Sequence, residues 1–224
     1  RKRSYRPLLP GIKFIEFNNE NDIDKINKNT AAVVLETIQG GAGFITPSDN
    51  YLKKVKNKCE ELNALLILDE IQPGMGRTGK LFAFEHYDII PDILVYGKGL
   101  GGGFPIGALS SSKKIMSSFK KNPILGHITT FGGHPVIAAA AYANLKETLD
   151  SKIMSKIYEK EKLFKGYLKH PLINEIRGKG LMLALIVNNK KIANQLVIKC
   201  LNKGLILFYL LFESKAVRIT PPLT

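Results

Sequence analysis

The run ALLILDEIQ at residues 64–72 constrains the fold more than any other stretch of the chain, because it is almost wholly apolar and carries its acids only near its end. A strand that faces solvent on one side alternates apolar and polar residues, whereas a strand buried on both faces of a parallel sheet does not. Runs of the same kind occur at residues 30–41 (TAAVVLETIQGG) and 92–99 (DILVYGKG). We therefore expect several buried strands in a mostly parallel sheet.

Helical patterns separate these strand candidates. The segment PSDNYLKKVKNKCEELN (47–63) reads as an amphipathic helix that begins near Ser48 or Asp49. A further strand candidate, PIGALSSS (105–112), precedes the long alanine-rich helix predicted for HPVIAAAAYANLKETL (134–149). Strands that alternate with helices predict an α/β layer fold with helices on both faces of the sheet.

The pattern changes at Ser151, where a charged helical segment is followed by strand patterns, one further helix and short strands joined by glycine turns. This change predicts a smaller α+β domain at residues 151–224 beside part of a larger α/β domain at residues 1–150. The sequence begins RKRSYRPLLP without Met and ends just after a strand-like segment. We therefore expect a fragment that is truncated at both ends.

Composition excludes some classes of protein. The net charge of +14 comes from 33 Lys and Arg against 19 acids, and the lysines are scattered along helical segments, which favours a solvated basic surface over a nucleic-acid site. Cys59 and Cys200 lie far apart without the spacing of a disulfide framework or a zinc site, and Cys59 falls on a helical stripe of core residues. No apolar run reaches the ~20 residues of a membrane span. We expect a cytoplasmic protein with no metal and no membrane contact.

Two glycine motifs match the dinucleotide spacing, GMGRTG at 74–79 and GKGLGG at 97–102. A dinucleotide loop opens a helix and is followed by an acid for the ribose, and neither motif has that context. GMGRTGK also resembles a phosphate-binding loop, but Leu81 stands where Ser or Thr would hold magnesium. We interpret both motifs as tight turns and Arg77 as a structural residue that pairs with a nearby acid.

A different site is predicted from Asp69 and Lys98, which follow two of the buried strands. The carboxyl ends of parallel strands meet at one sheet edge, where such sheets bind ligands. A lysine among apolar neighbours loses solvation, which favours the neutral amine that attacks a carbonyl. A Schiff-base lysine with a carboxylate partner is what pyridoxal phosphate requires, and the surrounding glycines would give the lysine room to move.

Four motifs in order make the chain similar to a known family. LETIQGGAG, the long segment from LILDEIQPGMGRTGK to GKGLGGGFPIGA, HITTFGGHP and VRITPPL together resemble the class III (subgroup II) aminotransferases of the acetylornithine and ornithine type. The resemblance covers essentially the whole chain. It implies a fold type I pyridoxal-phosphate-dependent transferase.

The resemblance also implies roles for individual residues. Lys98 corresponds to the catalytic lysine that binds the cofactor covalently and later moves protons. Asp69 corresponds to the acid that pairs with the pyridine nitrogen, Ile71 to the residue packed on the ring, and Gln72 to the donor that binds the phenolic oxygen.

Three further positions match the family. Thr130 corresponds to the hydroxyl that reaches the cofactor phosphate of the neighbouring subunit, which implies a homodimer with the active site at the interface. Arg218 corresponds to the arginine that binds the substrate α-carboxylate, and Glu36 to a glutamate near the lysine. Taken singly, Arg218 could be a surface cation, Thr130 a strand residue and Glu36 a strand-end acid.

The implied activity is transfer of the terminal amine of N-acetylornithine, or a similar amino acid, to 2-oxoglutarate, as in arginine biosynthesis. Gly41 stands where many relatives carry a glutamate thought to shield the substrate arginine, and His134 where many have Asn. The alternatives are an ornithine, lysine or 4-aminobutyrate aminotransferase, a non-catalytic truncated relict, or a basic binding module. The N-terminal half of the family's chain, with a phosphate-binding loop, has no counterpart in this sequence.

Overall fold

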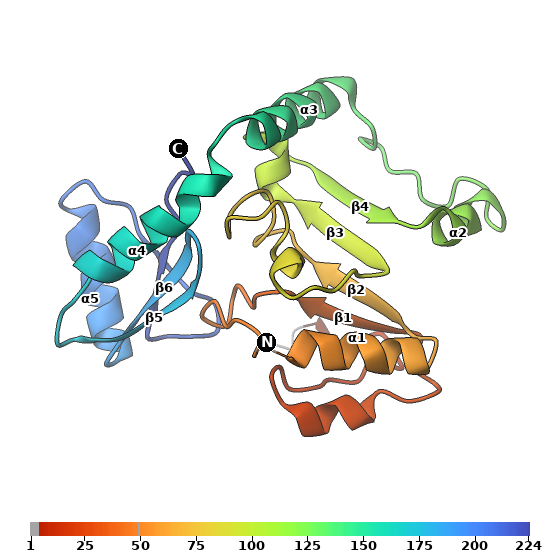
Figure 1. Ribbon diagram of the computed structural model, residues 1–224, viewed down its shortest axis with the longest axis horizontal. Coiled ribbons are helices and arrows are strands. Elements are labelled where there is room, and N and C mark those ends of the chain that lie inside the picture. The colour runs from red at the N-terminus through yellow and green to blue at the C-terminus, as the bar shows by residue number, and fades with distance from the viewer. Residues whose placement is uncertain (1–4, 49) are drawn as a thin grey trace.

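The computed structural model describes residues 5–48 and 50–224, which contain two four-stranded sheets (Figure 1). The order in the first sheet is β1 (Ala32–Glu36), β2 (Leu65–Asp69), β3 (Ile93–Gly97) and β4 (Gly107–Ser111). The three expected strands are confirmed as parallel neighbours, but the expected burial on both faces is wrong for β1, whose Val34 is exposed. The strand predicted at residues 105–112 is present but runs antiparallel to β3.

Helix α1 (Tyr51–Glu61) covers one face of the first sheet. Its residues Leu52 and Cys59 pack in one core cluster with Leu66 and Leu68 of β2, and Leu66, Leu68 and Cys59 have no exposed surface. The predicted helical stripe and the core position of Cys59 are confirmed. Full burial of a Leu side chain stabilises the fold by about 2 kcal/mol.

The start of α1 differs from the expectation. Asn50 is its N-cap and makes no side-chain cap hydrogen bond. Ser48 contributes its backbone carbonyl, which accepts a hydrogen bond from the Tyr51 N–H at 3.0 Å. Asp49 lies outside the described residues.

Helix α3 (Pro135–Asp150) lies against η4 (Lys98–Gly101), the short 3-10 helix that follows β3 (Figure 1). Its residues Ala141 and Leu145 pack with Leu100, and also with Tyr96 and Ala108 of the first sheet. Small side chains allow this close contact.

Tyr96 and Ala108 lie on the same face of the sheet as Leu94, which packs with α1, so α1 and α3 cover one face. Val34 and Leu109 on the opposite face are exposed, so the expected helices on both faces are not found among the described residues.

The second sheet has the order β5 (Ile173–Lys179), β6 (Met182–Val187), β8 (Ala216–Ile219) and β7 (Phe208–Tyr209), and all its neighbours are antiparallel. The strand predicted over LILFYL is thus only two residues long. Helix α5 (Lys190–Leu201) packs on one face of this sheet, and α4 (Ile157–Tyr167) contributes Phe164 to the same core.

Strand β6 is buried on both faces and joins the two halves of the molecule. Leu183, Leu185 and Val187 face the core that α5 shares. The alternate residues Met182, Ala184 and Ile186 pack with Ile38, Phe44 and Ala83 from the first half. The domain boundary predicted near residue 150 coincides with the end of α3 and stays a prediction.

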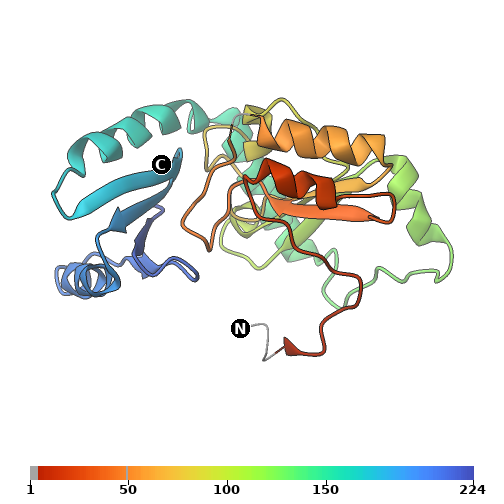
Figure 2. The same cartoon turned by 90° about the horizontal axis from the view of Figure 1, so that it is seen from below.

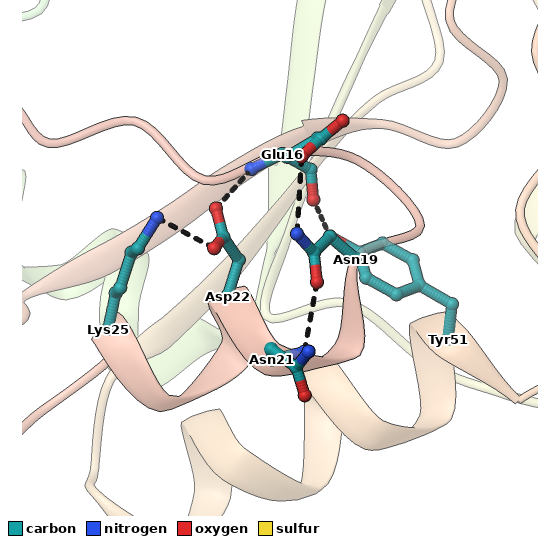
Figure 3. A network of polar contacts seen from close by, with 6 residues as sticks. All are labelled: Glu16, Asn19, Asn21, Asp22, Lys25 and Tyr51. Atoms are coloured by element: carbon teal, nitrogen blue, oxygen red, sulfur yellow. Dashed lines mark hydrogen bonds and ion pairs between the residues drawn. The ribbon is translucent and has the colours of Figure 1, made fainter.

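A polar network holds the segment before β1 in place (Figure 3). The side chain of Asn19 caps η2 (Glu20–Lys25), and Asp22 accepts the Glu16 N–H at 2.8 Å while it pairs with Lys25 at 2.6 Å. The Tyr51 hydroxyl of α1 donates to the Glu16 carbonyl at 3.5 Å.

The described part also contains η3 (Ala83–His86), α2 (Lys113–Met116), η5 (Ser117–Lys120) and η6 (Met154–Lys156). Within residues 5–48 and 50–224, none of the helices has the length and apolar character to cross a membrane.

Candidate active site

The carboxyl ends of the parallel strands bring three ionisable residues together. Glu36 ends β1, Asp69 ends β2, and the two are direct partners in the strand register. Lys98 follows the last residue of β3. The charges of Asp69 and Lys98 both act on Glu36. The edge of the sheet therefore holds an acid pair beside a lysine, as the parallel arrangement predicted.

Burial raises the pKa of Glu36 above its ordinary value of 4.5. The Gly40 N–H, 2.8 Å from Oε2, lowers this pKa, the negative charge of Asp69 raises it, and the positive charge of Lys98 lowers it. Because burial is the largest effect, Glu36 keeps its proton to a higher pH than a solvated glutamate does. It can therefore hold a proton close to Lys98.

The turn that leaves β2 is fixed by Asp69 and accommodated by Gly40. Asp69 Oδ1 accepts the Ile71 N–H at 2.9 Å. A Cβ at position 40 would lie 2.2 Å from Gln72 Oε1 and 3.1 Å from Glu36 Oε2. Only glycine at this position leaves room for both the Gln72 amide and the Glu36 carboxylate.

Lys98 has a backbone φ of 39°, in the left-handed region that residues with side chains seldom adopt. Such conformations cluster at functional sites. Asn144 of α3 holds the adjacent peptide, because its Nδ2 donates to the Gly99 carbonyl at 2.6 Å. Lys98 itself is exposed, so the expectation that it lies among apolar neighbours is wrong. The buried strand ends at Gly97, one residue earlier.

The glycines beside Lys98 permit close packing rather than movement. A Cβ at position 97 would lie 2.8 Å from the Ile106 carbonyl oxygen, and one at position 99 would lie 3.1 Å from Met75 Cβ. The interpretation of GKGLGG as a turn agrees with the structure, since this motif forms a short 3-10 helix and then leads into β4. Ile106 and Met75 therefore pack closely against the glycines on either side of Lys98.

A cavity of 460 Å³ lies beside Lys98 and gathers four of the predicted site residues, Ile71, Gln72, Lys98 and Arg218. This volume is within the range of small-molecule and cofactor sites. Among the described residues, Glu36, Asp69 and Thr130 do not line the cavity. Glu36 and Asp69 nevertheless lie next to it through the turn that carries Ile71 and Gln72.

Arg218 reaches the cavity from the second sheet. It lies on β8 between Ala184 of β6 and Phe208 of β7. Its Nε donates to Thr220 Oγ1 at 2.9 Å, and its Cζ is 6.0 Å from the centre of the Phe208 ring. These contacts orient a planar donor that suits a carboxylate.

Arg77 also lines the cavity, and the prediction that it pairs with an acid is wrong. Its Nη1 donates to the carbonyls of Leu181 at 3.4 Å and Pro221 at 2.5 Å. Burial, followed by the charge of Arg218, lowers its pKa. The nearby acceptors are backbone carbonyls of the second half of the chain, which the sequence around GMGRTG does not indicate.

Thr130 is exposed and does not join the other predicted residues. It belongs to the connection between α2 and α3. This connection runs on the side of the first sheet away from the second sheet (Figures 1 and 2). The predicted contact of Thr130 with a neighbouring subunit stays a prediction.

Asn144 and Thr220 are residues that the sequence analysis missed. Asn144 lies in an alanine-rich helix and Thr220 next to two prolines, so neither residue type signals a role; their hydrogen bonds to the distant Gly99 and the nearby Arg218 reveal them. No group of three His, Cys, Asp or Glu among residues 5–48 and 50–224 is arranged to hold a metal ion.

The residues at this edge fit pyridoxal phosphate. They offer an exposed primary amine at Lys98, a carboxylate pair at Glu36 and Asp69, and a Gln72 amide next to Gly40. An amine for the aldehyde and an acid for the ring nitrogen are the two groups this cofactor needs. Arg218 on the same cavity adds a donor for an anionic substrate.

Comparison with known proteins places this geometry in context. The sequence model of the family described as "Aminotransferase class-III" matches residues 12–224. The chain is 42% identical to the acetylornithine aminotransferase of Clostridium acetobutylicum, over 99% of this chain and 57% of that protein. It is 41% identical to the putrescine aminotransferase of Pectobacterium atrosepticum, over 100% of this chain and 50% of that protein. The chain thus spans about half the length of these relatives.

Solved structures agree in fold. The ornithine aminotransferase of Toxoplasma gondii superposes with a TM-score of 0.89 at 34% identity, over 98% of this chain and 53% of that one. The acetylornithine aminotransferase of Elizabethkingia anophelis gives a TM-score of 0.88 at 34% identity, over 97% and 56%. The predicted fold class, that of the pyridoxal-phosphate-dependent transferases of fold type I, is confirmed.

Proposed function

Because the chain belongs to the class III aminotransferases, we propose that it carries the pyridoxal-phosphate site of an enzyme that transfers the terminal amine of N-acetylornithine, or a similar amino acid, to 2-oxoglutarate. One observation carries the proposal. Lys98, Gln72 and Arg218 line one cavity, and Asp69 and Glu36 lie at the adjoining strand ends. An amine, a ring-binding acid and a carboxylate-binding arginine are the groups that such a transfer needs.

Each residue has a defined task in the proposed reaction. When bound, pyridoxal phosphate supplies an electron sink for the carbanion next to the transferred nitrogen. Lys98 would hold the cofactor covalently through its primary amine and would move a proton as general acid and base. Asp69 keeps the pyridine nitrogen protonated, a charge-assisted contact of about 1.5–3 kcal/mol. Ile71 and Gln72, which line the cavity, would pack on the ring and donate to its phenolic oxygen, respectively.

Arg218, on β8 of the second sheet, is the residue that we assign to substrate binding. Arg218 binds the α-carboxylate with two parallel N–H donors, because its Nε is already engaged by Thr220. Glu36, whose pKa is raised mainly by burial, holds a proton beside Lys98. Thr130 binds the cofactor phosphate of a second copy, so that a homodimer is the smallest complete enzyme. We place this enzyme in the cytoplasm and in arginine biosynthesis.

The identity of the amino donor is the finer part of the proposal. The acetylornithine relative supports N-acetylornithine, and the putrescine relative supports a related terminal amine. Rates of the first half-reaction with N-acetylornithine, ornithine, lysine and 4-aminobutyrate distinguish the candidates. A faster rate with 4-aminobutyrate than with N-acetylornithine would remove the acetylornithine assignment.

The test is covalent capture of the cofactor. Pyridoxal phosphate is added to the purified protein, the visible Schiff-base absorbance is recorded, and the adduct is reduced with borohydride and located by peptide mass spectrometry. We expect the band and a labelled Lys98 in the wild type, loss of both in Lys98→Ala, and both unchanged in Lys203→Ala, whose lysine is exposed. Bleaching of the band by N-acetylornithine completes the test.

A missing band in the wild type, or a label that does not depend on Lys98, contradicts the proposal. It would favour a non-catalytic relict. Binding of DNA with a steep salt dependence and no cofactor band would instead favour a basic binding module.

A further inference from the structure

Two hydrogen bonds join the loop that carries Arg77 to Leu181, in the turn between β5 and β6 of the second sheet. The Leu181 N–H donates to the Arg77 carbonyl at 3.0 Å, and Arg77 Nη1 donates back to the Leu181 carbonyl at 3.4 Å. A Cβ at Gly180, whose φ is +61°, would lie 2.6 Å from the Arg77 carbonyl oxygen and 2.6 Å from Thr78 Cα. The turn between β5 and β6 is thus pressed directly onto the Arg77 backbone.

The same guanidinium holds the segment that follows β8. Arg77 Nη1 lies 2.5 Å from the carbonyl oxygen of Pro221. Thr220, the residue directly before Pro221, accepts the Arg218 Nε–H at 2.9 Å through its hydroxyl. Two hydrogen bonds therefore connect Arg77 to Arg218 through adjacent residues, while the Phe208 ring lies 6.0 Å from Arg218 Cζ.

The two arginines are like charges that line one cavity. Burial, followed by the charge of Arg218, lowers the pKa of Arg77. Among the described residues, neither guanidinium has a carboxylate within ion-pair distance. Repulsion between such neighbours favours movement of the less constrained side chain unless hydrogen bonds fix it.

We propose that Arg77 is a positioning residue that holds the Arg218 guanidinium, through Pro221 and Thr220, in the orientation that binds a substrate carboxylate across the cavity from Lys98. The inference rests on the proposed function, because it assigns Arg218 to a carboxylate. Lysine cannot replace Arg77, since an ammonium is a point charge that lacks the planar fork with its several fixed donors. Displacement of Arg218 weakens the binding of the carboxylate and leaves the chemistry at Lys98 unaffected.

The test combines Arg77→Lys, Thr220→Val and the double variant with Arg177→Lys as control. Arg177 lies on β5, close to the same turn, but pairs with Glu175 at 2.9 Å. We measure the kcat and KM for 2-oxoglutarate, and by calorimetry the Kd for glutarate, a dicarboxylate that cannot react. The Schiff-base absorbance of each variant reports whether the Lys98 site is intact.

We expect each single variant to raise the KM for 2-oxoglutarate and the Kd for glutarate about tenfold, with kcat unchanged, because a displaced Arg218 binds the carboxylate less well in the ground state and in the transition state alike. The double variant should resemble either single variant, since both act through the same Arg218. Arg177→Lys should leave all values unchanged.

An unchanged KM and Kd in Arg77→Lys, a loss of kcat alone, or effects that multiply in the double variant would overturn the inference. Failure of the wild type to bind glutarate would overturn it as well. If the wild type binds glutarate with the expected pattern among variants but transfers no amine, the inference stands and the proposed function falls.

Discussion

Glu70, directly after Asp69 and without exposed surface, is the group whose titration should control the stability of the site. Its Oε1 accepts the Thr37 hydroxyl at 2.6 Å and the Phe84 N–H at 2.8 Å, and its Oε2 accepts the Ala83 N–H at 2.9 Å. Burial raises its pKa from 4.5 to about 7, against these hydrogen bonds, which lower it. The carboxyl thus prefers to be protonated in the folded state.

The raised pKa fixes the sign of a pH effect on stability. The stabilisation is fully present below the unfolded pKa, near 4.5, and is lost as the pH rises through the folded pKa of about 7. The difference between these two values corresponds to roughly 3 kcal/mol in the free energy of unfolding. In the protonated form, the carboxyl can donate to Thr37 and still accept from Ala83 and Phe84.

Glu70→Gln isolates this effect because glutamine resembles the protonated acid. If its Nε2 takes the place of Oε1 and donates to Thr37, the Phe84 N–H loses its acceptor, which costs about 1–3 kcal/mol. The variant should therefore be less stable than the wild type at pH 5. At pH 8 the wild type should have lost roughly 3 kcal/mol relative to the variant, so that the two become similar or change order.

Urea unfolding followed by far-ultraviolet circular dichroism measures these free energies, and the chain has no tryptophan for fluorescence. The quantity of interest is the difference between wild type and variant as a function of pH, because the other titrating groups cancel in it. This prediction is refuted if the free energies of unfolding of wild type and variant depend on pH in the same way, or if the wild type gains stability over the variant as the pH rises. Either result would show that the three hydrogen bonds affect the pKa of Glu70 more than burial does.

Two further predictions concern packing and thiol reactivity. Gly178→Ala should destabilise the protein by more than about 2 kcal/mol in the same assay, because the φ of Gly178 is +113° and a Cβ there would lie 2.0 Å from the Met182 carbonyl oxygen. Gly166→Ala in α4 should instead stabilise the protein by up to about 1 kcal/mol, because a Cβ at Gly166 would have no atom within 4 Å. Cys200 should react with a maleimide long before Cys59 in the native protein, since Cys59 is fully buried and burial raises its pKa to about 11; equal labelling rates, read by peptide mass spectrometry, would contradict this.

The sheet could be predicted because short apolar runs without helical periodicity mark strands of a sheet, even though one face of this sheet leaves Val34 and Leu109 exposed. The runs around Leu68 and Val95 therefore identified β2 and β3, and parallel pairing then placed Asp69 and Lys98 at one edge. The direction of a strand could not be predicted in this way, because it depends on the length of the connection to its neighbour and not on the composition of the strand. The antiparallel direction of β4 follows from its short connection to β3, and the run before it contains nothing that reports this.

The contacts of Arg77, Asn144 and Arg218 could not be predicted for a related reason. Arg77 and Asn144 donate to backbone carbonyls, and every residue carries a carbonyl, so no residue type marks the acceptor. Arg218 uses the hydroxyl of Thr220, two residues away, but the sequence does not say which of its donors is engaged. Pattern analysis finds the groups that perform chemistry more readily than the groups that orient them.

Gly41 illustrates how a departure from the family pattern depends on a distant residue. A Cβ at position 41 would lie 3.0 Å from Phe212 Cδ2 and 3.1 Å from its Cε2, and the Phe212 N–H donates to the Gly41 carbonyl at 2.9 Å. The Phe212 ring therefore occupies the space that the side chain of a family glutamate would enter. Glycine at position 41 is explained by this packing, so its presence does not by itself indicate a change of amino donor, and any substitution there also tests whether Phe212 can move.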